Sequence, residues 1–111
     1  MNKFDLLALF RRCPHGSMLF EVAQEAARRV DASKAIRIVV SEPRASEMIL
    51  RIYTRRLAAI HDRHEQVPGL EETVQALTNA TGQLRGGYAE TDNGLIYFFT
   101  DEPGRLIGCV L

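Results

Sequence analysis

The chain has 111 residues, 46% of them hydrophobic, and its 14 Lys and Arg balance its 14 Asp and Glu. This composition indicates one folded domain, residues 1–111, and excludes a disordered chain. The lack of any apolar run of about 18 residues argues against a membrane-spanning helix, and the zero net charge argues against nucleic-acid binding. The N-terminal residues do not follow the pattern of a signal peptide, so we expect a cytoplasmic protein.

Periodic apolar residues predict helices, and short runs of β-branched and aromatic residues predict strands. The first helix is expected to place Phe4, Leu7 and Ala8 on one side, with Leu6 and Phe10 next to it. Asp92-Asn93-Gly94 is a strong hairpin signal between two strands. In chain order, we expect helices over residues 4–12 and 18–30, a strand over 35–40, helices over 44–65 and 71–79, and strands over 83–91, 95–99 and 105–111.

The order ααβααβββ predicts a single α+β domain. Its last three strands form an antiparallel meander, packed against helices, and the strand at residues 35–40 joins one of the two edges. Gly86 and Gly87 interrupt one strand of the meander. Such glycines indicate either a bulge or the close approach of another backbone.

The strand at residues 95–99, Leu-Ile-Tyr-Phe-Phe, is apolar on both faces. A strand with one face in water alternates apolar and polar residues, so something must cover both faces of this one. Helices, a second subunit or a ligand can do so. We expect four helices to cover two faces only in part, which favours a homodimer or a pocket between the sheet and a helix.

The long helix carries an arginine that breaks its amphipathic pattern. At about 100° per residue its apolar side chains fill one broad arc, and Arg56 projects from the middle of that arc. The stem of Arg56 can pack on the core while its head reaches solvent, or a carboxylate can pair with it inside, or it can bind an anionic ligand in a pocket. The candidate carboxylates are Glu90, Asp92, Asp101 and Glu102. The candidate ligand-binding residues are Arg56, Tyr53, Tyr88 and Tyr97.

Arg44, Arg51 and Arg55 lie on the opposite side of the same helix. Such a stripe is either a solvated helix face or a surface that binds an acidic protein partner. Charge is also divided along the chain, because residues 1–65 hold 12 Lys and Arg against 8 Asp and Glu, and residues 66–111 hold 2 against 6. The two halves can attract each other within one molecule or between molecules.

His61 and His64 are three residues apart at the end of the long helix, with Glu65 one turn beyond His61. This spacing suits either two metal ligands or a solvated helix end.

The two cysteines lie near opposite ends of the chain, which is not a disulfide framework. Cys109 alternates with apolar residues of a strand and is expected to be a buried thiol. Cys13, two residues before His15, is a candidate reactive thiol.

These patterns predict a non-catalytic interaction or regulatory domain that forms a homodimer and uses the arginine stripe to orient an acidic partner. The alternative is a protein that binds a small anionic molecule, or a small enzyme, with its pocket around Arg56 between the sheet and the long helix. The sequence contains no glycine-rich nucleotide loop or nucleophile motif, and we predict no cofactor.

Overall fold

The computed structural model describes residues 1–14, 17–80 and 83–111, and it confirms the predicted α+β order. The helices are α1 (Lys3–Arg11), α2 (Ser17–Ala32), α3 (Pro43–Asp62) and α4 (Leu70–Asn79), and the strands are β1 (Ile36–Val40), β2 (Arg85–Thr91), β3 (Gly94–Thr100) and β4 (Leu106–Val110). None of these helices is long and apolar enough to cross a membrane.

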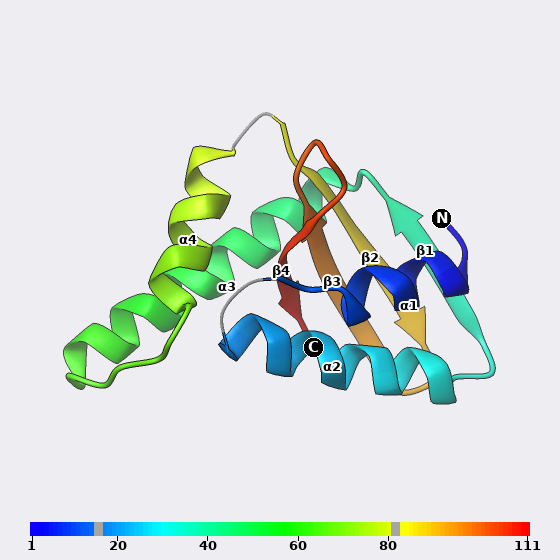
Figure 1. The fold of residues 1–111 in the computed structure, drawn as a ribbon, viewed down its shortest axis with the longest axis horizontal. Coiled ribbons are helices and arrows are strands. Elements are labelled where there is room, and N and C mark those ends of the chain that lie inside the picture. Colours follow the sequence, from blue (N-terminus) through cyan, green and yellow to red (C-terminus); the bar gives the residue numbers. More distant parts are fainter. Residues whose placement is uncertain (15–16, 81–82) are drawn as a thin grey trace.

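The four strands form one sheet in the order β1-β2-β3-β4, and all neighbours are antiparallel (Figure 1). The predicted meander is therefore present, and β1 joins it beside β2. In this register Tyr88 of β2 lies opposite Tyr97 of β3, which in turn lies opposite Val110 of β4. Those three side chains share one face of the sheet.

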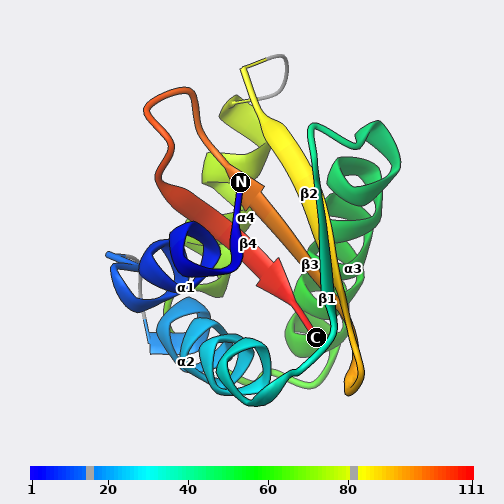
Figure 2. The ribbon, with the colours of Figure 1, turned by 90° about the vertical axis from the view of Figure 1, so that its right-hand side faces the viewer.

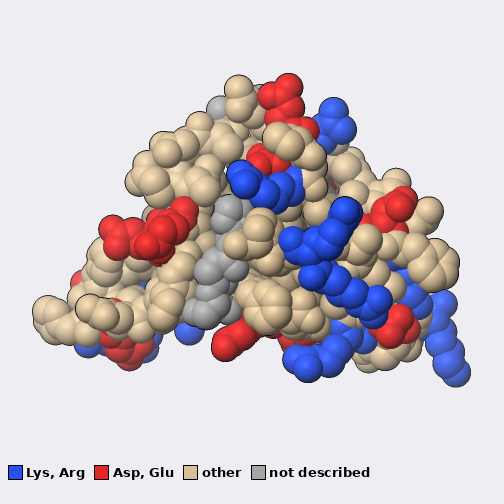
Figure 3. All heavy atoms as spheres, in the orientation of Figure 1, with Lys and Arg blue, Asp and Glu red and all other residues tan. Residues whose placement is uncertain are grey.

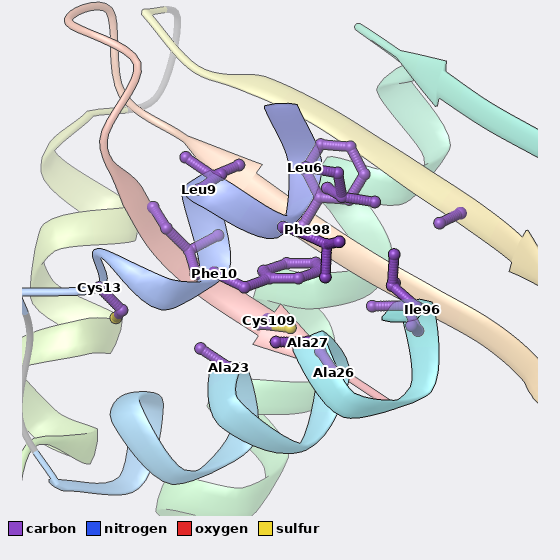
Figure 4. Packing of buried hydrophobic residues seen from close by; sticks show 14 of the residues in the cluster. Leu6, Leu9, Phe10, Cys13, Ala23, Ala26, Ala27, Ile96, Phe98 and Cys109 are labelled. Carbon is purple, nitrogen blue, oxygen red and sulfur yellow. The ribbon is translucent and has the colours of Figure 1, made fainter. Parts of the chain in front are cut away.

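Helices lie on both faces of the sheet, with α1 and α2 on one side and α3 and α4 on the other (Figure 2). Ile96 and Phe98 of β3 are buried on the α1–α2 side, where Phe98 meets the ring of Phe10 edge-on at 6.2 Å (Figure 4). On the α3–α4 side Phe99 is buried, but Leu95 is 43% exposed. Cover of this second face is therefore partial.

The first helix buries most of the predicted apolar side but turns Phe4 to solvent. Phe4 is 79% exposed, whereas Leu6, Leu9 and Phe10 are buried. Leu7 of the predicted side is buried, as are the adjacent Leu6 and Phe10, so the prediction is wrong for Phe4. Burying Leu6, Leu9 and Phe10 removes more apolar surface from water than burying Phe4 beside Ala8, so the helix turns that side to the sheet.

α3 lies directly on two glycines of the sheet. Gly86 of β2 and Gly108 of β4 are both opposite Phe99. A Cβ atom at Gly86 would lie 2.7 Å from the backbone nitrogen of Ser46 in α3, and the pairing of β2 with β3 is continuous past it. Gly86 therefore marks a close approach of the helix, and an irregularity of register lies elsewhere, between Phe99 and Thr100.

A polar contact ties the loop before β1 to the turn between β2 and β3. The buried Ser33 hydroxyl lies against the Asp92 carboxylate, and the Lys34 N–H donates to the same carboxylate at 3.5 Å. The hydrogen bond from Ser33 holds the pKa of Asp92 below its ordinary value of 3.8. On the other side of the loop, Lys3 Nζ donates to the Ser33 carbonyl at 2.9 Å.

This lowered pKa makes the contact sensitive to acid. A carboxylate with a lower pKa in the folded state contributes stability above its ordinary pKa, and that contribution is lost as the pH falls through its folded pKa. Asp92→Asn should therefore lower the unfolding free energy at neutral pH and cost progressively less below about pH 4. Urea unfolding at several pH values measures this difference. Glu102→Gln, in another exposed turn, should show no such trend.

Candidate functional site

The four residues predicted to form one ligand pocket line two surface hollows. Tyr88 and Tyr97 line a hollow of about 370 Å³ over β2 and β3, which we call the tyrosine hollow. Tyr53 and Arg56 line another, of about 360 Å³, between α2, α3 and the end of β4. The hollows adjoin, because Tyr97 of the first is opposite Val110 of the second.

Two aromatic rings form the floor of the tyrosine hollow. The Tyr88 and Tyr97 ring centroids are 6.2 Å apart, with the planes tilted by 52°. Ala45 at the start of α3 forms one wall, and the exposed Leu95 lies at the rim. The remaining lining residues are charged: Glu42, Arg44 and Glu90. The hollow therefore combines two aromatic rings with charged side chains of both signs.

The start of α3 explains why this part of the sheet stays open. Glu42 caps the helix by accepting a hydrogen bond from the Arg44 N–H at 3.1 Å, and Pro43 takes the first helical position. The Glu42 N–H donates to the Gly86 carbonyl at 2.7 Å. The helix is thus fixed over Gly86 and runs toward Gly108, beside the row that holds Tyr88 and Tyr97.

Tyr53 joins α3 to β4. Its hydroxyl donates to the Cys109 carbonyl at 2.6 Å and accepts from the Cys109 N–H at 3.1 Å. Burial raises the pKa of Tyr53 well above its ordinary value of 10.0, so the hydroxyl stays protonated at neutral pH. Because the Tyr53 hydroxyl proton is already donated to the Cys109 carbonyl, this hydroxyl holds α3 to β4 rather than binding a ligand.

Arg56 is exposed, although it lies near the apolar arc of α3. It lines the second hollow beside Met18 and Glu21 of α2. No carboxylate of the described residues lies within 4.0 Å of its guanidinium, while Glu90 and Asp101 pair with Arg37 and Arg105. The proposed internal pairing with Glu90, Asp92, Asp101 or Glu102 is therefore wrong, and the head of Arg56 reaches solvent.

All three residues of the predicted arginine stripe, Arg44, Arg51 and Arg55, are exposed. Among the residues that the structure describes, none of their guanidinium groups lies within 4.0 Å of a carboxylate. On a helical wheel, Met48 and Ile52 lie between the stripe and Ala45, the wall of the tyrosine hollow. Met48 is exposed and Ile52 is half-buried. We call Arg44, Met48, Arg51, Ile52 and Arg55, together with the tyrosine hollow, the α3 surface.

His61 lies in the last turn of α3 and His64 just beyond it, and both line one surface hollow. α3 ends at Asp62, and His64 takes a left-handed conformation with φ 55°. The Glu65 N–H then bonds to the Ile60 carbonyl at 3.1 Å, which is the pattern of a Schellman cap. The predicted helix to residue 65 is therefore three residues too long. Within the described parts of the chain, no three His, Cys, Asp or Glu side chains are grouped to hold a metal ion.

Both cysteines are buried in the core on the α1–α2 side (Figure 4). The prediction of a buried thiol at Cys109 is confirmed, and burial raises its pKa well above the ordinary value of 9.0. Cys13 is also buried, which opposes reaction at an exposed loop. His15, its predicted neighbour, lies outside the described residues.

Charge is displayed unevenly on the surface. On the face seen in Figure 3, Lys and Arg gather over α1 and α2, and acidic side chains lie over the α4 side. The first turn of α4 supplies Glu71 and Glu72, both exposed. The two charged regions are open to solvent and accessible to other molecules.

Comparisons of this chain with protein-family models, curated proteins and solved structures each found no match. The function is therefore inferred from surface geometry alone. Sequence reasoning missed Glu42, Glu90 and Leu95 as neighbours of the tyrosines. The Glu42-Pro43 pair was an available signal for the start of α3, since proline favours the first helical position.

Proposed function

We propose that this chain is a non-catalytic protein-interaction or regulatory domain of the cytoplasm. It binds an acidic partner across the α3 surface, and it self-associates. The observation that carries the proposal is the composition of the α3 surface, where Tyr88 and Tyr97 line a hollow with Arg44, and Met48 is exposed on α3 together with Arg51 and Arg55. Tyrosine, methionine and arginine are enriched at protein interfaces, which combine an apolar centre with a polar rim.

The charge of the α3 surface favours an acidic partner. Arg44, Arg51 and Arg55 extend over about three turns of helix and have no ion pair within the described residues. Of the acidic residues at the tyrosine hollow, Glu90 already pairs with Arg37 at 3.8 Å. Carboxylates of a partner would thus meet unoccupied guanidinium groups, which raises the association rate and fixes orientation.

An extended partner fits this surface better than a small anionic ligand. The groups predicted to hold such a ligand are divided between two hollows, and the Tyr53 hydroxyl is bound to Cys109. Arg56 lines the second hollow, about 18 Å along α3 from Arg44 by helical rise. The buried thiols of Cys13 and Cys109 support a reducing compartment.

Arg51→Ala/Arg55→Ala should weaken binding of an acidic peptide by about two- to thirty-fold, since each exposed ion pair contributes about 0.2–1 kcal/mol. The dependence of affinity on salt should fall as well, while the melting temperature stays unchanged. Fluorescence anisotropy with a labelled peptide of alternating glutamate and leucine measures this at low and high salt.

Arg28→Ala/Arg29→Ala on α2 is the matched control, because it removes the same charge from the other side of the sheet. Equal weakening by the two double variants would show that only net charge matters. Unchanged binding after loss of Arg51 and Arg55 would remove the arginine stripe from the proposed interface.

A further inference from the structure

β1 is the open edge of the sheet. Figure 2 views the sheet from this edge, and no helix crosses the outer side of β1. Among the described residues, Ile36–Val40 has no backbone hydrogen bond from a loop or turn, and β2 is its one strand neighbour. β4 at the opposite edge is different, because four of its five residues are buried and three helices contact it. No residue of β1 is buried.

Apart from one charged residue, Arg37, the strand lacks the features that usually protect an open edge. Proteins block such edges with proline, with a bulge or with a charged side chain. β1 reads Ile-Arg-Ile-Val-Val, without proline, and its register with β2 is continuous. Its single charge, Arg37, is 3.8 Å from Glu90 of β2, which lies on the inner side of the strand. The outer edge is therefore free to pair.

We propose that two copies of this chain associate edge to edge through β1, in antiparallel orientation, so that their four-stranded sheets become one continuous sheet. The inference rests on the proposed self-association and names its surface. A two-fold axis through the edge makes the contact self-complementary, as in most homodimers. Backbone groups that otherwise face water would then complete a ladder of hydrogen bonds.

Charge selects the register of this pairing. With the axis at Ile38, Ile36 lies opposite Val40 of the second copy, and the whole strand is paired. Lys34, just before the strand, then lies at the same end of the pair as Glu42 of the second copy, which follows the left-handed Ser41 (φ 64°), and the same approach occurs at the other end. The side chains of Lys34 and Glu42 lie at the surface of the monomer. Among the described residues, neither forms an ion pair.

The neighbouring registers are less favourable. An axis at Arg37 would place the two Arg37 side chains directly opposite each other, which is destabilising. An axis at Val39 would pair only residues 38–40 of the two strands and leave Ile36 without a partner, because the chain turns away at Ser41. The Ile38 register avoids both faults.

Exposed apolar side chains stand beside the edge. Val40 is 37% exposed at the end of β1, and Phe4 is 79% exposed at the start of α1. The start of α1 is held near the start of β1, because Lys3 bonds to the Ser33 carbonyl. In the Ile38 register, the start of one β1 lies beside the end of the other. Pairing therefore brings Phe4 of one copy toward Val40 of the other.

The expected dimer is weak. A strand of five residues is about 17 Å long, so its edge buries less surface than a permanent interface. We expect a dissociation constant on the order of micromolar. Sedimentation velocity from about 1 to 200 µM should show the wild-type chain passing from monomer to dimer.

Val40→Lys places a charge at the edge and should weaken the dimer at least tenfold. Leu95→Lys is the matched control, because Leu95 is a strand residue of similar exposure, 43%, on the tyrosine side of the sheet. It should dimerise as the wild type does. Circular dichroism checks that both variants fold.

Two outcomes separate the inference from the proposed function. A dimer that survives Val40→Lys and is lost in Leu95→Lys would overturn pairing through β1 and leave self-association standing, on the α3 surface. A wild-type chain that remains a monomer throughout would overturn both self-association and its β1 surface.

A charge exchange tests the register. Lys34→Glu and Glu42→Lys should each weaken the homodimer, because each brings like charges together at both ends of the paired strands. An equimolar mixture of the two variants should form a heterodimer tighter than either homodimer, since both end pairs are then restored. A mixture no tighter than the separate variants would overturn the Ile38 register. Glu42 also caps α3, so melting temperatures are measured alongside.

Discussion

Phe98→Ala and Phe99→Ala should each lower the free energy of unfolding by about 3–5 kcal/mol, the usual cost of deleting a buried aromatic ring. Both rings are almost fully buried, yet they belong to opposite faces of β3. Phe98 packs in the core under α1 and α2, and Phe99 packs under α3 and α4. Urea unfolding followed by circular dichroism measures both losses.

The dependence of the Phe99→Ala loss on protein concentration tests whether helices or a second subunit cover the α3–α4 side of the sheet. Because helices of the same chain cover Phe99, the unfolding free energy lost in Phe99→Ala should be equal at about 1 and 100 µM protein. A loss for Phe99→Ala that grows with concentration would show that a second subunit contributes to its burial. Leu95→Ala, on the exposed part of the same strand, should change stability by less than about 0.5 kcal/mol.

Gly86→Ala should destabilise the domain by about 1–3 kcal/mol, although it adds one methyl group. That methyl would lie 2.7 Å from the backbone nitrogen of Ser46, so the start of α3 must move. The move also strains the hydrogen bond from the Glu42 N–H to the Gly86 carbonyl. Thermal unfolding measures the loss, at roughly 4–8 °C per kcal/mol for a small domain.

Gly108→Ala is the control for this substitution. A Cβ there would lie 3.3 Å from a methyl group of Ile49, a side chain that can adjust. Its cost should be clearly smaller than that of Gly86→Ala. Equal costs would mean that general crowding under α3, rather than the fixed backbone at Ser46, limits this contact.

The order of elements could be predicted because apolar periodicity survives in each segment, but some helix ends could not. α3 stops at a left-handed residue, and glycine usually marks that position. Here His64 takes it, so no residue type signalled the end. The orientation of α1 was also ambiguous from the sequence, since Phe4 and Phe10 are both apolar and only packing decides between them.

The candidate site was predictable only in part. The pairing of Tyr88 with Tyr97 follows from the two-residue turn at Asp92 and Asn93, because counting outward from that turn sets the register. The position of Arg56 does not follow from a helical wheel. A helical wheel gives only the direction of each side chain around the helix axis. The path of α3 across the sheet is set by its contacts with Gly86 and Gly108.

The placement of β1 beside β2 has a consequence for how the chain folds. β2, β3 and β4 follow one another directly, and the β2–β3 turn closes over Asp92 and Asn93. β1 can reach β2 only after residues 41–84 have been looped out, and the entropy cost of closure rises with loop length. The meander is thus the local part of the topology, and β1 is its distant addition. The contact of Ser33 with Asp92 holds the start of β1 against the β2–β3 turn. That end of β1 is the one opposite to where residues 41–84 leave the strand.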